Sequence, residues 1–286
     1  MKTPSKPVSR PLAGTTGPVA RRPGFPVRLE PDAGIPSATK KVAGRAHPER
    51  ATVIFDPKKS APTGLSSGVG LDSKAVRARM VHKLAAQGIA DAQVLAAMGQ
   101  VERHRFVDTA LVNQAYEDTS LPIGLGQTIS KPNVVARMLE LLRQSVASPQ
   151  GRLGRVLEIG TGCGYQAAVL AHLASEVYSI ERLRGLHEKA RENLRAFRLA
   201  NLHLLFGDGM AGYAKGAPYA AIIAAAGGEA IPPAWVEQLA MGGRLVAPMH
   251  VAGGAQALVV LDKTPQGVTQ TVLEAVHFVP LKSGTS

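Results

Sequence analysis

The chain has 286 residues, a single cysteine, only 4% aromatic residues and no long apolar run. The single cysteine, Cys163, excludes a disulfide within the chain and any metal site built from several cysteines. No stretch of about 18 apolar residues occurs, so the sequence predicts no membrane-spanning helix. The basic N-terminus has no apolar segment of the kind that a Sec signal needs, and we therefore expect a cytoplasmic protein.

Residues 1–70 lack large apolar side chains and are rich in Pro, Gly, Ser and basic residues. This segment contains twelve Lys and Arg residues and four acidic residues, so it carries eight of the chain's twelve net positive charges. Such a composition cannot bury enough apolar surface to offset the entropy lost on ordering, and it predicts a disordered basic extension. A nucleic-acid-binding arm is an open alternative, but Phe25 and Phe55 are its only aromatics, so we favour a solvated extension.

The most informative stretch that is present runs from Val156 to Tyr165. Apolar residues lead into Gly160, Gly162 and Gly164 at every second position, and a run of helical length follows. This order predicts a buried strand, a tight turn and a helix. Glycine suits the turn because it tolerates strained backbone and lets a ligand approach closely. The G-x-G-x-G spacing differs from the G-x-G-x-x-G fingerprint of dinucleotide sites.

Acidic residues accompany three successive predicted strands. Glu158 precedes the glycine turn, Glu181 ends the next strand, and Asp208 follows the third. Carboxyl ends of parallel strands meet at one edge of a sheet, so we expect the three acids to line one crevice. Glu158 is suited to bind a cationic group, Glu181 to accept from ribose hydroxyls, and Asp208 to accept from an adenine amino group. S-adenosylmethionine contains all three groups, so the three acids together predict it as the ligand. The alternative is a purely structural turn with solvated acids.

The remaining pattern predicts an α/β fold with a doubly wound, mostly parallel, Rossmann-like sheet. Helical periodicity precedes the glycine turn, and strands alternate with helices after it. Segments 256–262 and 268–279 are typical of a closing antiparallel strand pair. We therefore divide a single domain, 71–286, into an N-terminal helical cap with a substrate loop (71–150) and a cofactor-binding sheet (151–286).

Six segments of the sequence carry a resemblance to a known family. They are Leu121–Ser130, Val156–Leu170, Val177–Arg182, Gly207–Gly209, Gly242–Val246 and Phe278–Leu281, and the most specific part is Gln127-Thr128-Ile129-Ser130. Together they resemble the protein-L-isoaspartate O-methyltransferase family, a family of class I S-adenosylmethionine-dependent methyltransferases. The resemblance covers about residues 73–281, and the first 70 residues lie outside it.

The resemblance implies a repair enzyme. Its members methylate the free α-carboxylate of L-isoaspartyl, and also D-aspartyl, residues in damaged proteins and peptides, and the ester then closes to a succinimide. Ser130 is implied as the active-site residue and Gln127, Thr128 and Ile129 as substrate-binding residues. A monomer and no metal are expected. The implied cofactor-binding residues are Glu158, Gly160, Thr161, Gly162, Gly164, Glu181, Asp208 and Gly209.

Some features leave alternatives open. Ala220 and Ala225 stand where the family commonly has Asp and Thr. A non-catalytic S-adenosylmethionine-binding protein is therefore one alternative. The basic extension suggests a second, a nucleic-acid methyltransferase, although no base-methylating Asn-Pro-Pro-Tyr motif occurs. Ser130 is also a candidate N-cap of the helix predicted at Pro132–Gln144, whose N–H groups are candidate donors to the acceptor carboxylate. His104 is more typical of a structural than of a site histidine.

Overall fold

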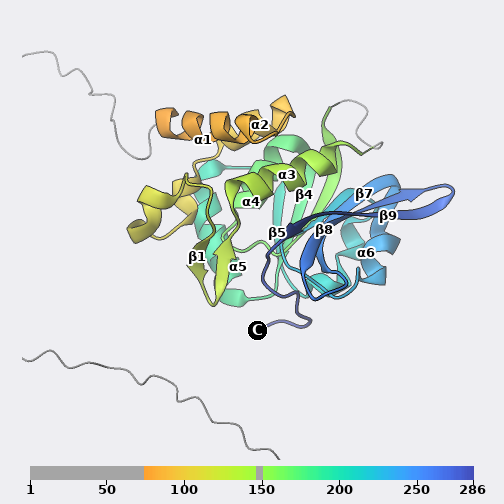
Figure 1. The fold of residues 1–286 in the computed structure, drawn as a ribbon. Coiled ribbons are helices and arrows are strands. Elements are labelled where there is room, and N and C mark those ends of the chain that lie inside the picture. Colours follow the sequence, from red (N-terminus) through yellow and green to blue (C-terminus); the bar gives the residue numbers. More distant parts are fainter. Residues whose placement is uncertain (1–73, 146–150) are drawn as a thin grey trace, which may run out of the picture. The chain divides into compact units, whose positions relative to one another are not determined.

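The computed structural model describes residues 74–145 and 151–286 (Figure 1). The extension predicted at residues 1–70 lies outside the described residues, so its disorder stays a prediction. Within the two described ranges, no helix is long and apolar enough to cross a membrane.

The core of the fold is a seven-stranded sheet in the order β5-β4-β3-β6-β7-β8-β9. Neighbours from β5 to β7 pair in parallel, and the β7–β8 and β8–β9 pairs are antiparallel. The mostly parallel sheet and its C-terminal antiparallel pair are confirmed. The strands are β3 (Leu153–Ile159), β4 (Ala174–Glu181), β5 (Leu202–Phe206), β6 (Tyr219–Ala224), β7 (Leu239–His250), β8 (Gln256–Thr264) and β9 (Gly267–Val276).

In residues 74–145 and 151–286, three helices form the N-terminal cap and three more belong to the sheet domain. Asp91 caps α2, because its side chain accepts from the N–H groups of Gln93 and Val94 at the start of that helix. The helices are α1 (Lys74–Ala86), α2 (Ala92–Gln100), α3 (Pro132–Arg143), α4 (Tyr165–Leu173), α5 (Arg184–Leu194) and α6 (Pro233–Gln238). Short 3-10 turns lie at η1 (Arg103–Phe106), η2 (Thr109–Gln114), η3 (Arg195–Phe197), η4 (Gly209–Ala211) and η5 (Ala214–Gly216).

The sheet is covered on both faces. From β3 the chain steps to β4 in one direction, whereas from β6 it steps to β7 in the other. Because crossovers between parallel strands are right-handed, α4 and α6 must lie on opposite faces. Side chains of β3 follow this division: Val156 joins the core beneath α2, α3 and α4, and Leu157 joins the core that contains Trp235 of α6.

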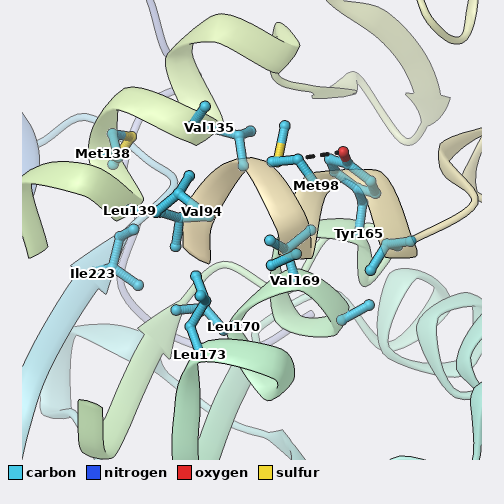
Figure 2. Close-up of a cluster of buried hydrophobic side chains, with 14 of the residues drawn as sticks. Val94, Met98, Val135, Met138, Leu139, Tyr165, Val169, Leu170, Leu173 and Ile223 are labelled. Carbon is cyan, nitrogen blue, oxygen red and sulfur yellow. Dashed lines mark hydrogen bonds between the residues drawn. The ribbon is translucent and has the colours of Figure 1, made fainter. Parts of the chain in front are cut away.

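The helical cap is tied to the sheet domain through apolar packing between α2, α3 and α4 (Figure 2). Val94 of α2 and Leu139 of α3 are both fully buried. At one end of this cluster the Tyr165 hydroxyl of α4 donates to Met98 Sδ of α2 at 3.6 Å. The residue that follows the glycine turn is therefore held by the cap.

A small hairpin lies outside the main sheet. The strands β1 (Leu121–Gly124) and β2 (Gln127–Ile129) pair antiparallel where the sequence predicted a polar loop. Three consecutive residues make its turn with positive φ, namely Gly124 at 97°, Leu125 at 51° and Gly126 at 69°. The strands contain four and three residues, too short to show the alternation that identifies a strand.

Candidate active site

A cavity of about 260 Å³ lies at the carboxyl ends of β3 and β4. Its wall is made by the β1–β2 hairpin, the glycine turn, the ends of β4 and β6, and a C-terminal segment. The chain leaves β3 towards one edge of the sheet and leaves β6 towards the other, so this is the topological switch point of the sheet. Open α/β sheets bind their ligands at that point.

All four residues of the predicted substrate segment, Gln127 to Ser130, line this cavity. Gly160, Thr161 and Gly162 line it as well, so the acceptor segment and the cofactor turn share one surface. The Ser130 side chain is half-buried, and no hydrogen bond joins its hydroxyl to another described residue. Its hydroxyl therefore remains available to a ligand.

The alternative interpretation of Ser130 as a helix cap is wrong. Lys131 occupies the N-cap position of α3 and makes no side-chain capping bond. The N–H of Asn133 donates to Asp118 Oδ1 at 2.9 Å instead. An acidic side chain from the preceding loop thus occupies the first free N–H of α3, which removes that group as a donor to a substrate carboxylate.

The predicted cofactor-binding glycines have different structural roles. The first three form the glycine turn. All have positive φ, at 90° for Gly160, 57° for Gly162 and 93° for Gly164. Gly164 does not line the cavity, and a Cβ there would lie 2.7 Å from Leu194 Cδ1 of α5. Gly209 does line the cavity, and a Cβ there would lie 2.5 Å from Ile159 Cγ2. Two of the predicted glycines, Gly164 and Gly209, thus allow chain segments to pack closely.

Glu181 lies in the cavity wall at the end of β4. Its Oε2 accepts from the Gly162 N–H at 2.9 Å, and its Oε1 accepts from the Leu183 N–H at 2.9 Å. Each carboxylate oxygen has a further lone pair, so both oxygens retain capacity to accept from ligand hydroxyls. The two backbone bonds hold the carboxylate at the edge of the glycine turn.

Glu158 is fully buried and does not line the cavity. It lies two residues after Val156, so its side chain enters the same sheet face, beneath α4. Its Oε2 accepts a very short hydrogen bond from Ser179 Oγ, and Ser179 Oγ lies 2.6 Å from Thr161 Oγ1. Burial raises the pKa of Glu158 to about 8, so the group is mainly protonated at neutral pH.

Two buried polar atoms near the glycine turn lack a hydrogen-bond partner among the described residues. Glu158 Oε1 and Gln166 Nε2 are both buried and neither makes a hydrogen bond within the described residues. The Gln166 amide still lies close enough to lower the pKa of Glu158 against the larger effect of burial. Gln166 lines the cavity, and its unsatisfied Nε2 is buried behind that wall. Such atoms are expected where a polar ligand completes the site.

Asp208 is also absent from the cavity wall. Its Oδ1 accepts from the Met210 N–H at 2.9 Å, and its Oδ2 accepts from the Gly284 N–H at 2.7 Å. The expectation that three acids line one crevice is therefore wrong in part, because only Glu181 does so. The cofactor roles of Glu158 and Asp208 stay predictions.

Sequence reasoning missed the C-terminal side of the cavity. Residues 279–282 line it. Gly227 pins the segment, because its N–H donates to Val279 O at 2.8 Å and its carbonyl accepts from the Leu281 N–H at 2.7 Å. The only available signal was the family resemblance of Phe278–Leu281, which carries no chemical group of its own.

His104 and Cys163 have the surroundings of structural residues. Nδ1 of His104 lies 2.7 Å from the Tyr116 hydroxyl, which satisfies one ring nitrogen. Cys163 lines the cavity but is buried, and burial raises the pKa of its thiol to about 11. A thiol that stays protonated at neutral pH is a poor nucleophile, which argues against a catalytic role for Cys163.

Comparisons with known proteins agree with this geometry. The family model described as protein-L-isoaspartate(D-aspartate) O-methyltransferase matches residues 75–286. A protein-L-isoaspartate O-methyltransferase of Leptothrix cholodnii is 62% identical over 231 residues, covering 80% of this chain and 81% of its own length. One of Methylibium petroleiphilum is 57% identical over 265 residues, covering 92% and 97%.

The family model begins at residue 75, which agrees with the expectation that the first 70 residues lie outside the family resemblance. The second relative is similar over 92% of this chain, so its match also reaches into the first 73 residues. Among solved structures, a protein-L-isoaspartate O-methyltransferase is similar with a TM-score of 0.65 and 25% identity, covering 72% of this chain and 66% of that one. The similar solved structure and the family model thus name the same family.

Proposed function

This chain belongs to the protein-L-isoaspartate(D-aspartate) O-methyltransferase family, and from that premise we propose how its cavity carries out the family's reaction. S-adenosylmethionine is the methyl donor, and the acceptor is the free α-carboxylate of isoaspartyl residues in damaged proteins. One observation carries the assignment: the Gln127–Ser130 segment and the glycine turn at Gly160–Gly162 line the same cavity. Donor and acceptor can therefore be bound side by side.

The groups around the turn fit the cofactor. Glu181 presents two carboxylate oxygens with spare accepting capacity to the cavity, which suits the hydroxyls of a ribose. Gly160 and Gly162 leave space where side chains would intrude, and Gln166 offers an unsatisfied amide. When bound, S-adenosylmethionine supplies an electrophilic methyl group on a sulfonium.

Glu158 and Asp208 support the cofactor less directly in this proposal. Glu158 orders the turn through Ser179 and Thr161. It also keeps an unsatisfied oxygen beneath the turn. Asp208 holds Gly284 of the C-terminal segment, so its effect on the adenine region depends on that contact. Gly164 permits the close packing of α5, and Gly209 borders the cavity itself.

The acceptor side needs little chemistry from the protein. A carboxylate is already ionised at neutral pH, so no general base is required. The Ser130 hydroxyl donates a hydrogen bond that aims one carboxylate oxygen, and Gln127, Thr128 and Ile129 shape the surface around it. Holding two reactants in line can lower a barrier by several kcal/mol, which makes positioning the main contribution of these residues.

The proposal is tested by labelled methyl transfer to three acceptors: an isoaspartyl peptide, the same peptide with normal aspartate, and RNA. We expect a base-labile label on the isoaspartyl peptide alone, because a carboxyl methyl ester hydrolyses in base. Label on RNA would favour a nucleic-acid methyltransferase. Binding of S-adenosylmethionine without transfer to any acceptor would favour a non-catalytic binding protein.

We also propose that the enzyme acts as a monomer in the cytoplasm. The described residues of this chain enclose a cavity that contains both the Gln127–Ser130 segment and the glycine turn. Light scattering at micromolar concentration tests the monomer, and cell fractionation tests the location. A stable dimer whose dissociation abolishes transfer would contradict the first part.

A further inference from the structure

Arg103 is a fully buried arginine at the start of η1, and the reaction described above does not use it. Its Nε donates to Ala115 O at 2.7 Å, and its Nη2 donates to Ser130 O at 2.7 Å. The guanidinium also stacks over the Tyr165 ring, with Cζ 4.7 Å from the ring centroid. One side chain thus joins the cap, the acceptor segment and the first residue of α4.

The positive charge of Arg103 is buried without an acidic partner among the described residues. No ion pair joins it to an acid in the described ranges, and its Nη1 is buried without a hydrogen-bond partner there. Burying an unpaired ion costs several kcal/mol unless specific contacts compensate for it. Two carbonyl oxygens and an aromatic face supply only part of that compensation.

The position beside Ser130 explains the arrangement. Ser130 follows the β1–β2 hairpin, which is outside the main sheet, so among the described residues no strand of the main sheet fixes the Ser130 backbone. The rigid fork of a guanidinium can hold two carbonyls at once, which an ammonium cannot do with the same geometry. Fixing the Ser130 carbonyl restricts the direction in which its hydroxyl points into the cavity.

We propose that Arg103 is a positioning residue for methyl transfer, which fixes Ser130 relative to Tyr165 and the glycine turn. This inference rests on the proposed function of Ser130. Arg103 acts through Ser130 and touches neither substrate. Its loss should therefore impair the use of the acceptor and leave the binding of the methyl donor intact.

Arg77 provides a matched control. It is also a buried arginine of the cap, and its Nε donates to a backbone carbonyl, Gly99 O, at 2.7 Å. It makes no contact with Ser130 among the interactions described. Arg77 Nη1 also lies 3.8 Å from Glu102 Oε1, an ion pair that Arg103 lacks within the described residues. Substituting lysine at either position keeps the charge and removes the fork, so the two variants differ in which carbonyl they release and in the contact with Glu102.

The experiment measures methyl transfer to an isoaspartyl peptide, the affinity for S-adenosylmethionine by calorimetry, and thermal stability. Arg103→Lys should lower kcat/KM for the peptide by about tenfold or more, with cofactor affinity within about twofold of wild type. Arg77→Lys should keep kcat/KM within about twofold at a similar loss of stability. If Arg103→Lys fails to fold, Arg103→Gln replaces it, because that variant has no ion to bury.

A double-mutant cycle with Ser130→Ala separates positioning from general structure. Because Arg103 acts through Ser130, Arg103→Lys should lower kcat/KM much less in the Ser130→Ala background than in wild type. Equal losses in the two backgrounds, or equal losses in Arg103→Lys and Arg77→Lys, would overturn the inference alone. Failure of the wild type to methylate the isoaspartyl peptide would overturn the proposed function and this inference with it.

Discussion

The two walls of the cavity are built in different ways. On the donor side, the glycine turn is held by main-chain bonds to the sheet, since the N–H groups of Gly160 and Thr161 both donate to Ile180 O, at 2.8 and 3.2 Å. On the acceptor side, the hairpin lies outside the sheet and is held by long side chains. Arg103 binds Ser130 O, and Lys189 binds Ile123 O.

This difference separates two kinds of failure. A change in the donor wall disturbs backbone conformation and sheet packing, so it should affect folding and cofactor binding together. A change in the acceptor wall removes a hydrogen bond at the end of a small hairpin, so it should affect methyl transfer while the fold and the cofactor site survive. The four predictions below test that separation.

Gly164→Ala should have the largest effect. The residue has φ of 93°, and an added Cβ would lie 2.7 Å from Leu194 Cδ1. Backbone strain and overpacking together predict a loss of about 2–5 kcal/mol in the free energy of unfolding, with weaker cofactor binding. Urea unfolding and calorimetry measure both. Gly253→Ala is the control, because its φ of 91° is similar and nothing lies within 4 Å of the new Cβ. Equal effects of the two changes would contradict the packing argument.

Glu158→Gln should change how stability depends on pH. In the folded protein, burial raises the pKa of Glu158 from 4.5 to about 8. The folded state therefore holds this proton where the unfolded state has released it, and stability falls as pH rises through that interval. From this group we expect a loss of about 2–3 kcal/mol between pH ~5.5 and ~7.5 in the cofactor-free protein.

The Glu158→Gln variant should lack that loss, which urea unfolding at several pH values measures. Glu176→Gln is the control on the neighbouring strand. The hydrogen bond from Arg155 lowers the pKa of the half-buried Glu176, so the contribution of Glu176 to stability disappears only in acid. If the free energy of unfolding of Glu158→Gln depends on pH as in wild type, the pH-dependent loss of stability does not come from Glu158.

Ser130→Ala should act on the acceptor wall alone. Removing one hydrogen bond to an ionised group predicts a loss of about 1.5–3 kcal/mol, or roughly a tenfold to hundredfold fall in kcat/KM for an isoaspartyl peptide. Cofactor affinity and melting temperature should stay near wild type. Ser120→Ala, an exposed serine next to the hairpin, should change neither quantity. Full activity of Ser130→Ala would refute the assigned role.

Ala225→Thr should have the smallest effect. Ala225 lines the cavity at the end of β6 and is partly exposed, so an added methyl and hydroxyl have room. We expect a change of less than about 1 kcal/mol in cofactor binding and in kcat/KM for the peptide. Ala220→Ser, which lies outside the cavity wall, is the control. A tenfold change in either quantity would show that the residue at 225 selects substrates.

Part of the site is predictable because its signal is local. The strand, turn and helix from Leu153 to Leu173 follow from apolar runs and glycine spacing, and the structure confirms each element. The hairpin from Leu121 to Ile129 is not predictable in this way, because its strands are short and its turn contains Leu125 with positive φ. Leucine rarely adopts that conformation, so no local sequence pattern predicts it here.

By itself the sequence determined the order of the strands and helices, the turn glycines and the serine segment that identifies the family. Only the tertiary structure decided which polar groups face the cavity. Glu181 enters it, whereas Glu158 is buried beneath α4 and Asp208 is held by Gly284, 76 residues away in the chain. The physical reason is that the place of a residue in its strand fixes where its side chain begins. Burial and hydrogen-bond partners from distant parts of the chain then decide where that side chain lies and how its charge is satisfied.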